Sequence, residues 1–279
     1  MLTRFAPSPT GLLHLGHAAA AFHVWDAARS VGGSVRLRIE DIDRQRCRPE
    51  FEAAILEDLA WLGLNWDGPV RRQSEHFSAY RTAIETLADR GLVYRCFRTR
   101  AEIAAESDRA PHGAEPRFRG RPPPPAEEQA RLTRGDAHAW RLSVEAAHAA
   151  LGARASKLSY RETGHGPPRN VSVDWQALSD VVLARKDVPT SYHLACTHDD
   201  ALQGVTHIIR GDDLVASTPV HVVLQALMDW PTPVYHHHAL VRDEQGKRFA
   251  KRNRSMTLSA LRKKGVTPDD IRRMTLGHA

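Results

Sequence analysis

Two histidines near the start of the chain, His14 and His17, stand three positions apart with Gly16 between them. They follow residues 4–11, where two prolines and a glycine form a rigid turn. Apolar residues precede the turn and recur at helical spacing after it, which predicts a strand, a turn and the start of a helix. Free N–H groups at a helix start bind phosphate. The two imidazoles would stabilise phosphate charge in a transition state, and Gly16 would let a planar base approach the backbone.

Three other polar residues are suited to binding an amino acid. Glu40 follows a predicted strand over residues 35–39, at the end where open α/β sheets bind ligands, and its carboxylate would hold an ammonium group. Tyr192 and Arg210 both stand beside predicted strand ends, and arginine offers a planar fork for a carboxylate. The alternatives are a solvated acidic turn at Glu40 and a core position for Tyr192.

A basic segment over residues 246–252 contains Lys251. It follows a predicted strand, residues 234–241, and precedes a helix predicted to start near Thr257. A lysine loop in that place can close over a triphosphate and stabilise charge at the scissile phosphate. The alternative is a solvated basic surface. We expect a structural role for the three histidines 236–238, because adjacent positions on a strand point to opposite faces.

Residues 4–17 resemble the first signature of class I aminoacyl-tRNA synthetases in the glutamyl branch. Residues 248–252 resemble the second signature but depart from it at three places, with Lys251 retained and Ala250 replacing a serine. The resemblance implies activation of glutamate by ATP, accompanied by Mg²⁺, with catalytic roles for His14, His17 and Lys251. The ATP site it implies consists of His14, Gly16, His17 and Lys251. The glutamate site it implies consists of Arg4, Phe5, Ala6, Pro7, Ser8, Glu40, Tyr192 and Arg210.

The predicted elements belong to the α/β class. The resemblance implies a Rossmann-like nucleotide-binding fold with a small α+β insertion subdomain and a short helical C-terminal extension. We predict the first half of the catalytic domain over residues 1–92, a tRNA-gripping insertion over 93–179, the second half over 180–241, and the lysine loop with C-terminal helices over 242–279. The proline-rich residues 108–125 indicate a stiff extended linker or a poorly ordered arm.

Composition narrows the functional class further. The 279 residues are 42% hydrophobic and 26% charged, which is ordinary for a soluble globular protein, and the net charge of +6 weakly favours a polyanionic partner. We expect no membrane partner and a cytoplasmic location, because no apolar run could span a bilayer and no secretory signal precedes Arg4. Three widely spaced cysteines indicate neither a disulfide framework nor a metal cluster. We expect a monomer.

The second substrate is suggested by the length of the chain after Arg252, which is 27 residues. A full glutamyl-tRNA synthetase carries a large anticodon-reading domain there. The chain is more similar to the glutamyl-queuosine tRNA(Asp) synthetases, which activate glutamate without tRNA and attach it to queuosine in the anticodon of tRNA(Asp). One alternative is a truncated glutamyl-tRNA synthetase that charges a tRNA 3′ end. The other is a non-catalytic tRNA-binding relic, which the retained His14, His17 and Lys251 disfavour.

Many members of that family hold a structural zinc in the insertion through two cysteines one residue apart, a tyrosine and a third cysteine. Here Cys96 matches the first cysteine, but Arg98 occupies the second position. Residues 116–120 supply neither a tyrosine nor a cysteine, whereas a structural zinc site needs four ligands. We therefore expect no structural zinc, and we expect packing around Phe97 and Phe118 to hold the insertion.

Overall fold

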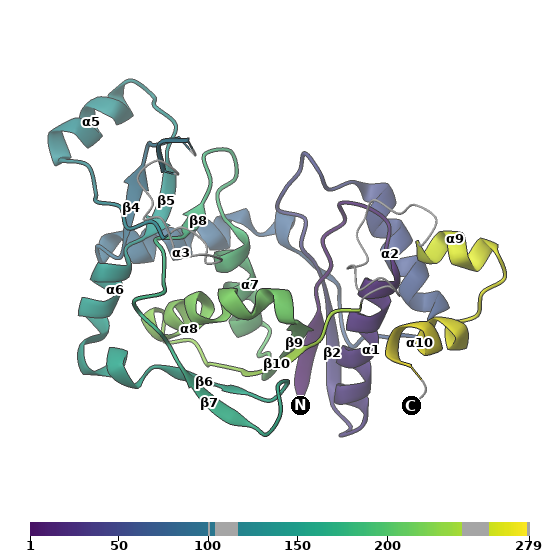
Figure 1. Ribbon diagram of the computed structural model, residues 1–279. Coiled ribbons are helices and arrows are strands. Elements are labelled where there is room, and N and C mark those ends of the chain that lie inside the picture. Colours follow the sequence, from purple (N-terminus) through teal and green to yellow (C-terminus); the bar gives the residue numbers. More distant parts are fainter. Residues whose placement is uncertain (100, 104–116, 242–256, 278–279) are drawn as a thin grey trace.

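The computed structural model describes residues 1–99, 101–103, 117–241 and 257–277 (Figure 1). Lys251 and most of the predicted linker, residues 108–116, lie outside the described residues. The helices are α1 (Leu15–Arg29), α2 (Pro49–Trp61), α3 (Phe77–Asp89), α5 (Pro125–Thr133), α6 (Val144–Leu151), α7 (Tyr192–Leu202), α8 (Thr218–Leu227), α9 (Leu258–Lys263) and α10 (Pro268–Leu276). The strands are β1 (Leu2–Phe5), β2 (Ser34–Ile39), β3 (Arg71–Arg72), β4 (Val93–Cys96), β5 (Ala139–Leu142), β6 (Ser159–Glu162), β7 (Arg169–Ser172), β8 (Val182–Ala184), β9 (His207–Gly211) and β10 (Val234–His238).

Two parallel strand groups meet at the centre of the molecule. Strands β1, β2 and β3 form one parallel sheet, and β6, β10 and β9 run parallel in a second sheet that β7 extends antiparallel. The N–H of Thr206 donates to the carbonyl of Leu2 at 2.9 Å, which joins the start of β9 to β1. Figure 1 shows α1, α2, α9 and α10 on one side of these strands and α3, α6, α7 and α8 on the other. The predicted α/β class is confirmed.

The N-terminal turn and helix form for local reasons. Prolines at positions 7 and 9 end β1, because a proline ring fixes the backbone angle and removes an N–H donor. His14 caps α1: its Nδ1 accepts the Gly16 N–H at 3.1 Å, while His17 Nδ1 accepts the His14 N–H at 3.2 Å. The two histidines therefore satisfy two N–H groups at the helix start.

The C-terminal helices cover this first motif. Thr257, which caps α9, forms an antiparallel bridge with His14, and the Leu258 N–H donates to the Leu13 carbonyl at 2.9 Å. Helix α10 packs on α1, where Arg272 pairs with Asp26 at 2.7 Å. Residues on either side of the segment 242–256 are therefore fixed: Val241 borders the central cavity described below, and Thr257 lies beside His14.

The segment predicted as an insertion contributes to two sheets. Its strand β6 pairs with β10 through Glu162 and Tyr235, while β4 and β5 pair antiparallel with each other and with β8. Strand β5 ends at Leu142, because Ser143 caps α6 by accepting the Ala146 N–H. The domain boundaries stay a prediction, and this pairing ties residues 159–172 to the second half of the catalytic domain.

Candidate active site

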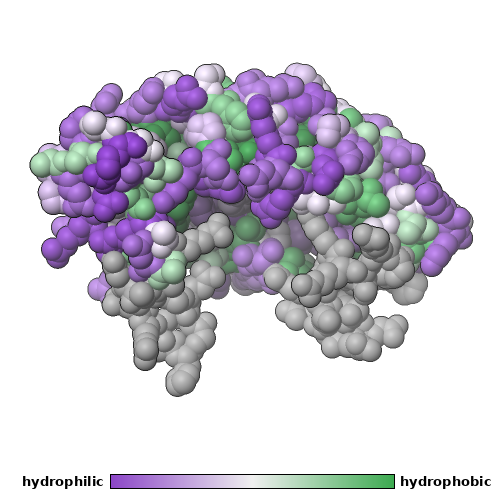
Figure 2. Space-filling model, turned by 90° about the horizontal axis from the view of Figure 1, so that it is seen from above, coloured by the Kyte–Doolittle hydropathy of each residue, from purple (hydrophilic) through white to green (hydrophobic). Residues whose placement is uncertain are grey.

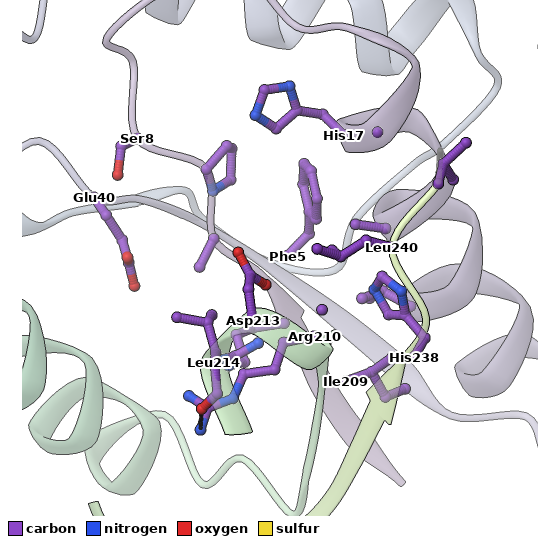
Figure 3. A pocket seen from close by; sticks show the side chains of 18 of the residues that line it. Phe5, Ser8, His17, Glu40, Ile209, Arg210, Asp213, Leu214, His238 and Leu240 are labelled. Carbon is purple, nitrogen blue, oxygen red and sulfur yellow. Dashed lines mark hydrogen bonds between the residues drawn. The ribbon is translucent and has the colours of Figure 1, made fainter. Parts of the chain in front are cut away.

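A cavity of about 620 Å³ opens where the two strand groups meet (Figure 3). It lies beyond the carboxyl ends of β1, β2 and β9, the location in which open α/β sheets bind ligands. Every described residue that the sequence predicted for glutamate or ATP lines it: Arg4, Phe5, Ala6, Pro7, Ser8, His14, Gly16, His17, Glu40, Tyr192 and Arg210. The structure thus brings together in one space residues that are more than 200 positions apart.

The cavity has a polar side and an apolar side. Figure 3 shows Ser8 and Glu40 on one side, with Leu240 and His238 on the other. Ala20, Val24, Ile209 and Val241 add further apolar surface. Figure 2 shows a face covered mostly by hydrophilic residues, with hydrophobic residues in its recessed central part. A polar side next to an apolar side suits a ligand that joins a charged group to a planar base.

The two signature histidines lie together at the N-terminus of α1. Their ring centroids are 3.9 Å apart, and the Nδ1 of each ring accepts a backbone N–H. In the neutral ring this places the proton on Nε2, which makes that nitrogen the donor. A Cβ on Gly16 would lie 3.1 Å from the His14 ring, so the glycine is also needed for the capping geometry.

Arg4 belongs to a buried ionic network that the sequence analysis did not predict. Its Nε contacts Asp200 Oδ1 at 2.9 Å, and Arg38 Nη1 contacts the same oxygen at 2.8 Å. Arg38 Nη2 also reaches Glu40 at 3.3 Å. Burial opposes ionisation of Asp200, but Arg38 and Arg4 hold its pKa below the ordinary value. Burial raises the pKa of Glu40 against the opposing effect of the same two arginines.

Arg210 has a different environment, made of neutral groups. Its Nε donates to His237 Nε2 at 3.2 Å, and Nη2 donates to Thr218 Oγ1 at 2.7 Å and to the Leu214 carbonyl at 3.2 Å. Its Nη1 contacts the Tyr192 hydroxyl and His221 Nδ1, both at 3.3 Å. Among the described residues, Arg210 has no carboxylate within ion-pairing distance.

The neighbouring histidines do not offset this charge. Burial and the Arg210 charge hold the pKa of His221 well below its ordinary value and lower the pKa of His193 to about 4. Both rings are therefore neutral near pH 7. Arg210 is only 5% exposed, so it is a buried cation at the wall of the cavity, and its hydrogen-bond partners in the described part of the chain are neutral. The Asp213 carboxylate, which is also in the described part, lines the same cavity but forms no ion pair with Arg210.

The position of Tyr192 differs from the sequence prediction. The sequence placed it beside a strand end, whereas it is the first residue of α7. Ser191 has extended backbone angles at the N-cap, and this turns the Tyr192 ring toward Arg210 and the cavity. Burial raises the pKa of Tyr192 well above its ordinary value, so the hydroxyl keeps its proton and can donate it to an anion.

The sequence analysis missed the residues that support the site, namely Arg38, Glu162, Asp200, Thr218, His221 and His237 as a partner of Arg210. One available signal was Arg38, which lies between the apolar residues Leu37 and Ile39 near the end of its strand, because an arginine buried there needs a partner. The adjacent acids Asp199 and Asp200 were the matching signal.

The segment that replaces the family's zinc site is held by aromatic and basic side chains. Phe118 is buried beneath Arg141, whose guanidinium carbon lies 4.8 Å from the ring centroid. Phe97 is half-buried, and Arg131 lies 5.2 Å from its ring centroid. The described residues contain no group of three or more His, Cys, Asp or Glu that could hold a metal ion, and the expectation of no zinc stays a prediction.

No helix within the described ranges is both long and apolar enough to cross a membrane.

Comparison with solved structures supports the fold. A glutamate tRNA ligase from Elizabethkingia meningosepticum, solved in complex with its amino acid, aligns with a TM-score of 0.73 and 30% identity. The alignment covers 91% of this chain and 52% of that one, so the present chain spans about half the length of this ligase. A Mycobacterium tuberculosis methionyl-tRNA synthetase aligns at 11% identity with a TM-score of 0.60, over 99% of this chain and 63% of that one, and shows the fold alone.

Curated relatives give a consistent result. A protein of Rhodobacter capsulatus named glutamyl-Q tRNA(Asp) synthetase is 47% identical, and the alignment covers 98% of this chain and 99% of the relative. A glutamate–tRNA ligase of Synechococcus is 36% identical over 96% of this chain and 56% of its own length. Residues 1–276 match the family described as tRNA synthetases class I (E and Q), catalytic domain. The resemblance in residues 4–17 is therefore confirmed, and the chain belongs to the class I tRNA synthetases of the E and Q group.

Proposed function

We propose that this protein activates glutamate with ATP in the absence of tRNA and transfers it to queuosine in the anticodon of tRNA(Asp). The observation that carries the proposal is Arg210, a buried cation with neutral partners at the wall of the cavity. A buried guanidinium is stable when an anion neutralises it, and a carboxylate matches its planar fork. The substrate carboxylate would supply that anion.

Glutamate fits the polar side of the cavity. Arg210 and Tyr192 both border the cavity, and the 3.3 Å contact between Arg210 Nη1 and the Tyr192 hydroxyl is long enough to exchange for a bound carboxylate. Glu40 lies on the same side and would hold the ammonium group. Arg4 and Ser8 complete this side, with the backbone of residues 5–7 as its floor.

Activation requires an in-line attack by a glutamate carboxylate oxygen on the α-phosphate of ATP, which breaks the bond to pyrophosphate. Positioning and charge stabilisation account for most of the catalysis of such reactions. His14 and His17 would donate through Nε2 to the phosphate that gains charge, at the positive end of α1. Lys251 would act on the same charge, with Mg²⁺ bound to ATP as part of the substrate. The base of ATP would lie on the apolar side, beside Gly16 and Leu240.

In the second step a hydroxyl of the modified base attacks the acyl carbon and releases AMP. The queuosine target is supported by the Rhodobacter capsulatus relative, because the alignment covers nearly the whole of both chains. The glutamate–tRNA ligases support the alternative of charging a tRNA 3′ end, but the alignment with the Synechococcus ligase covers only 56% of its length. The proposal includes a monomer that works in the cytoplasm, where tRNA is found.

Two assays test this function. Glutamate-dependent exchange of pyrophosphate into ATP should occur without tRNA, and glutamate should then be transferred to tRNA(Asp) that carries queuosine but not to tRNA(Asp) that lacks it. Exchange that requires tRNA, or transfer that is insensitive to queuosine, would instead favour an ordinary glutamate–tRNA ligase. No exchange under either condition would favour the non-catalytic tRNA-binding relic.

A further inference from the structure

Behind Arg210, a carboxylate and an imidazole form a buried chain of hydrogen bonds. Glu162 Oε2 lies 2.5 Å from His237 Nδ1, and His237 Nε2 lies 3.2 Å from Arg210 Nε. The three residues come from β6, β10 and β9, which are neighbours in one sheet. His237 is fully buried, and Glu162 and Arg210 are 3% and 5% exposed. The chain therefore runs from the protein interior to the cavity wall.

Glu162 is fixed as an acceptor by three N–H groups. Its Oε1 accepts the backbone N–H of Gly164 at 2.7 Å and of His237 at 3.2 Å, while Oε2 faces the His237 ring. These bonds hold the pKa of Glu162 below its ordinary value despite burial, so the side chain is an ionised carboxylate. An ionised carboxylate only accepts hydrogen bonds, so it requires the proton of His237 to be on Nδ1.

The position of the ring proton decides whether His237 offers Arg210 a hydrogen-bond acceptor or a donor. Burial and the Arg210 charge lower the pKa of His237 although Glu162 opposes this effect, so the ring is neutral. His237 Nε2 lies 3.2 Å from Arg210 Nε and 3.1 Å from the Thr218 hydroxyl. With the proton on Nδ1, Nε2 carries a lone pair and can accept from Arg210 Nε–H. The other tautomer would place two N–H donors against each other at 3.2 Å.

We propose that Glu162 and His237 are positioning residues for glutamate, which fix the Arg210 guanidinium so that its Nη1 edge faces the cavity. This inference rests on the proposed function, in which Arg210 binds a glutamate carboxylate. The orienting bonds use Nε and Nη2, which donate to His237 and Thr218, two residues that do not line the cavity; Nη2 also donates to the carbonyl of Leu214, a residue that does line it. The Nη1 edge contacts Tyr192, which does line it. The carboxylate of Glu162 remains one ring away from the guanidinium, so it orients the cation without forming an ion pair with it.

The first test is Glu162→Gln, which keeps the shape of the side chain but replaces one acceptor oxygen by a donor. If the amide oxygen still accepts the hydrogen bond from the Gly164 N–H, the amide NH₂ group faces His237 Nδ1. Nδ1 must then accept a hydrogen bond, so the ring proton of His237 moves to Nε2, which faces Arg210. The glutamate KM in tRNA-free exchange should rise about tenfold or more, since a hydrogen bond to a charged group is lost. The ATP KM and the kcat at saturating glutamate should remain within about threefold of wild type, because the altered contact affects glutamate binding.

Two comparisons separate positioning from a general structural effect. Glu145→Gln makes the same chemical change at an exposed position of α6 and should leave both KM values unchanged. In an Arg210→Lys background, Glu162→Gln should add little, because lysine has no Nε–H that points at His237. A rise in the glutamate KM of the same size in both backgrounds would overturn the proposal, as would equal losses in kcat and in both KM values.

A spectroscopic measurement makes the inference independent of activity and of whether Glu162→Gln folds. ¹⁵N NMR of histidine-labelled wild-type protein should show His237, identified by its loss in His237→Gln, as the Nδ1–H tautomer near pH 7. An Nε2–H tautomer in the wild type would overturn the inference even if exchange is normal. If wild-type protein shows no glutamate-dependent exchange, the proposed function fails, and the tautomer still decides whether Glu162 orients the ring.

Discussion

Arg4 and Arg210 are equally buried, each 5% exposed, and both border the cavity, yet the charge of their hydrogen-bond partners differs. Arg4 shares Asp200 with Arg38 in a network that joins β1 and β2 to α7. Arg210 is surrounded by a tyrosine, a threonine and neutral histidines. We propose that Arg4, which has a protein carboxylate as its partner, mainly supports the fold, whereas Arg210, whose described partners are neutral, binds an anionic ligand.

The two arginines could not exchange roles, because the strand that carries each one determines which residues its guanidinium reaches. Arg4 lies on β1, from which its guanidinium contacts Asp200 on α7. Within the described ranges it forms no hydrogen bond with α8 or with the 3₁₀ helix η3 (Asp212–Ser217). Arg210 lies at the end of β9, close to the Leu214 carbonyl and to Thr218 at the start of α8. The cavity thus has one guanidinium that a protein carboxylate neutralises, Arg4, and one whose described partners are neutral, Arg210.

The largest effect is expected from Asp200→Asn, which removes the carboxylate that Arg4 and Arg38 share. Leaving buried charges without their partner typically costs about 3–5 kcal/mol of the free energy of unfolding. Urea unfolding should show this loss, while the control Asp229→Asn, at an exposed position, should change stability by about 0.5 kcal/mol or less. Equal losses of unfolding free energy in Asp200→Asn and Asp229→Asn would mean that the contacts of Arg4 and Arg38 with Asp200 do not stabilise the fold.

Lys251→Ala separates the rate of the reaction from the binding of glutamate. Lys251 is proposed to act on transition-state phosphate charge, and loss of such a donor typically lowers the rate about 10²–10³-fold. Exchange measured at saturating glutamate should show this fall with little change in the glutamate KM. Near-normal exchange by a folded Lys251→Ala protein would mean that the basic segment is only a solvated surface.

Arg210→Ala and Arg4→Ala test the comparison directly. The glutamate KM should rise roughly 10- to 100-fold in Arg210→Ala, with a smaller change in the ATP KM, because a charged hydrogen-bond partner of the carboxylate is lost. Arg4→Ala should lose more unfolding free energy than Arg210→Ala and raise the glutamate KM less. A raised ATP KM with an unchanged glutamate KM in Arg210→Ala would remove Arg210 from the glutamate site.

Asp58 extends the comparison to a buried anion. Its side chain is 1% exposed, its closest cation is Arg262 at 3.7 Å, and burial raises its pKa to about 6. The folded-state pKa therefore lies above the unfolded value of about 3.9, so its contribution to stability is complete below pH 4 and is lost as the pH rises through 6. Asp58→Asn should raise the unfolding free energy by about 1 kcal/mol at pH 8, and by less at pH 5. Thermal unfolding at both pH values checks this, and a larger gain at pH 5 would contradict it.

The smallest effect is expected around Cys96, the position that matches the first cysteine of the family's zinc site, where arginine side chains occupy the region. Arg95 and Arg131 stack on Trp140 and Phe97 beside Cys96, and such a site should not attract a further cation. Elemental analysis of untagged protein should therefore find no stoichiometric zinc, and a chelator should leave the unfolding temperature unchanged. About one zinc per chain that resists mild chelation would refute this expectation.

Residues 2–40 show how much of the site could be predicted from local sequence. The prolines that end β1, the helix that starts at Leu15 and the strand over residues 35–39 all depend on neighbours in the chain, and the structure has them close to the predicted positions. The position of Glu40 at the cavity could be predicted because this residue comes directly after that strand.

The supporting residues could not be predicted because they depend on contacts between distant segments. Asp200 acquires its role from Arg4 and Arg38, which are 196 and 162 positions away. Tyr192 reaches the cavity because α7 starts at that residue, and no strand ends there. A structural role was expected for His237, and its contacts with Glu162 and Arg210 depend on the pairing of β10 with β6 and β9.

The bridge between His14 and Thr257 has a consequence for the order of synthesis. Helix α1 is among the first segments to leave the ribosome, but its partner α10, with Arg272 against Asp26 and Phe22, is made almost 250 residues later. At typical translation rates, α1 waits on the order of 10–50 seconds before that surface is covered. The nascent chain therefore carries its proposed phosphate-binding motif from the start, but the surface of α1 is covered only when α10 folds onto it.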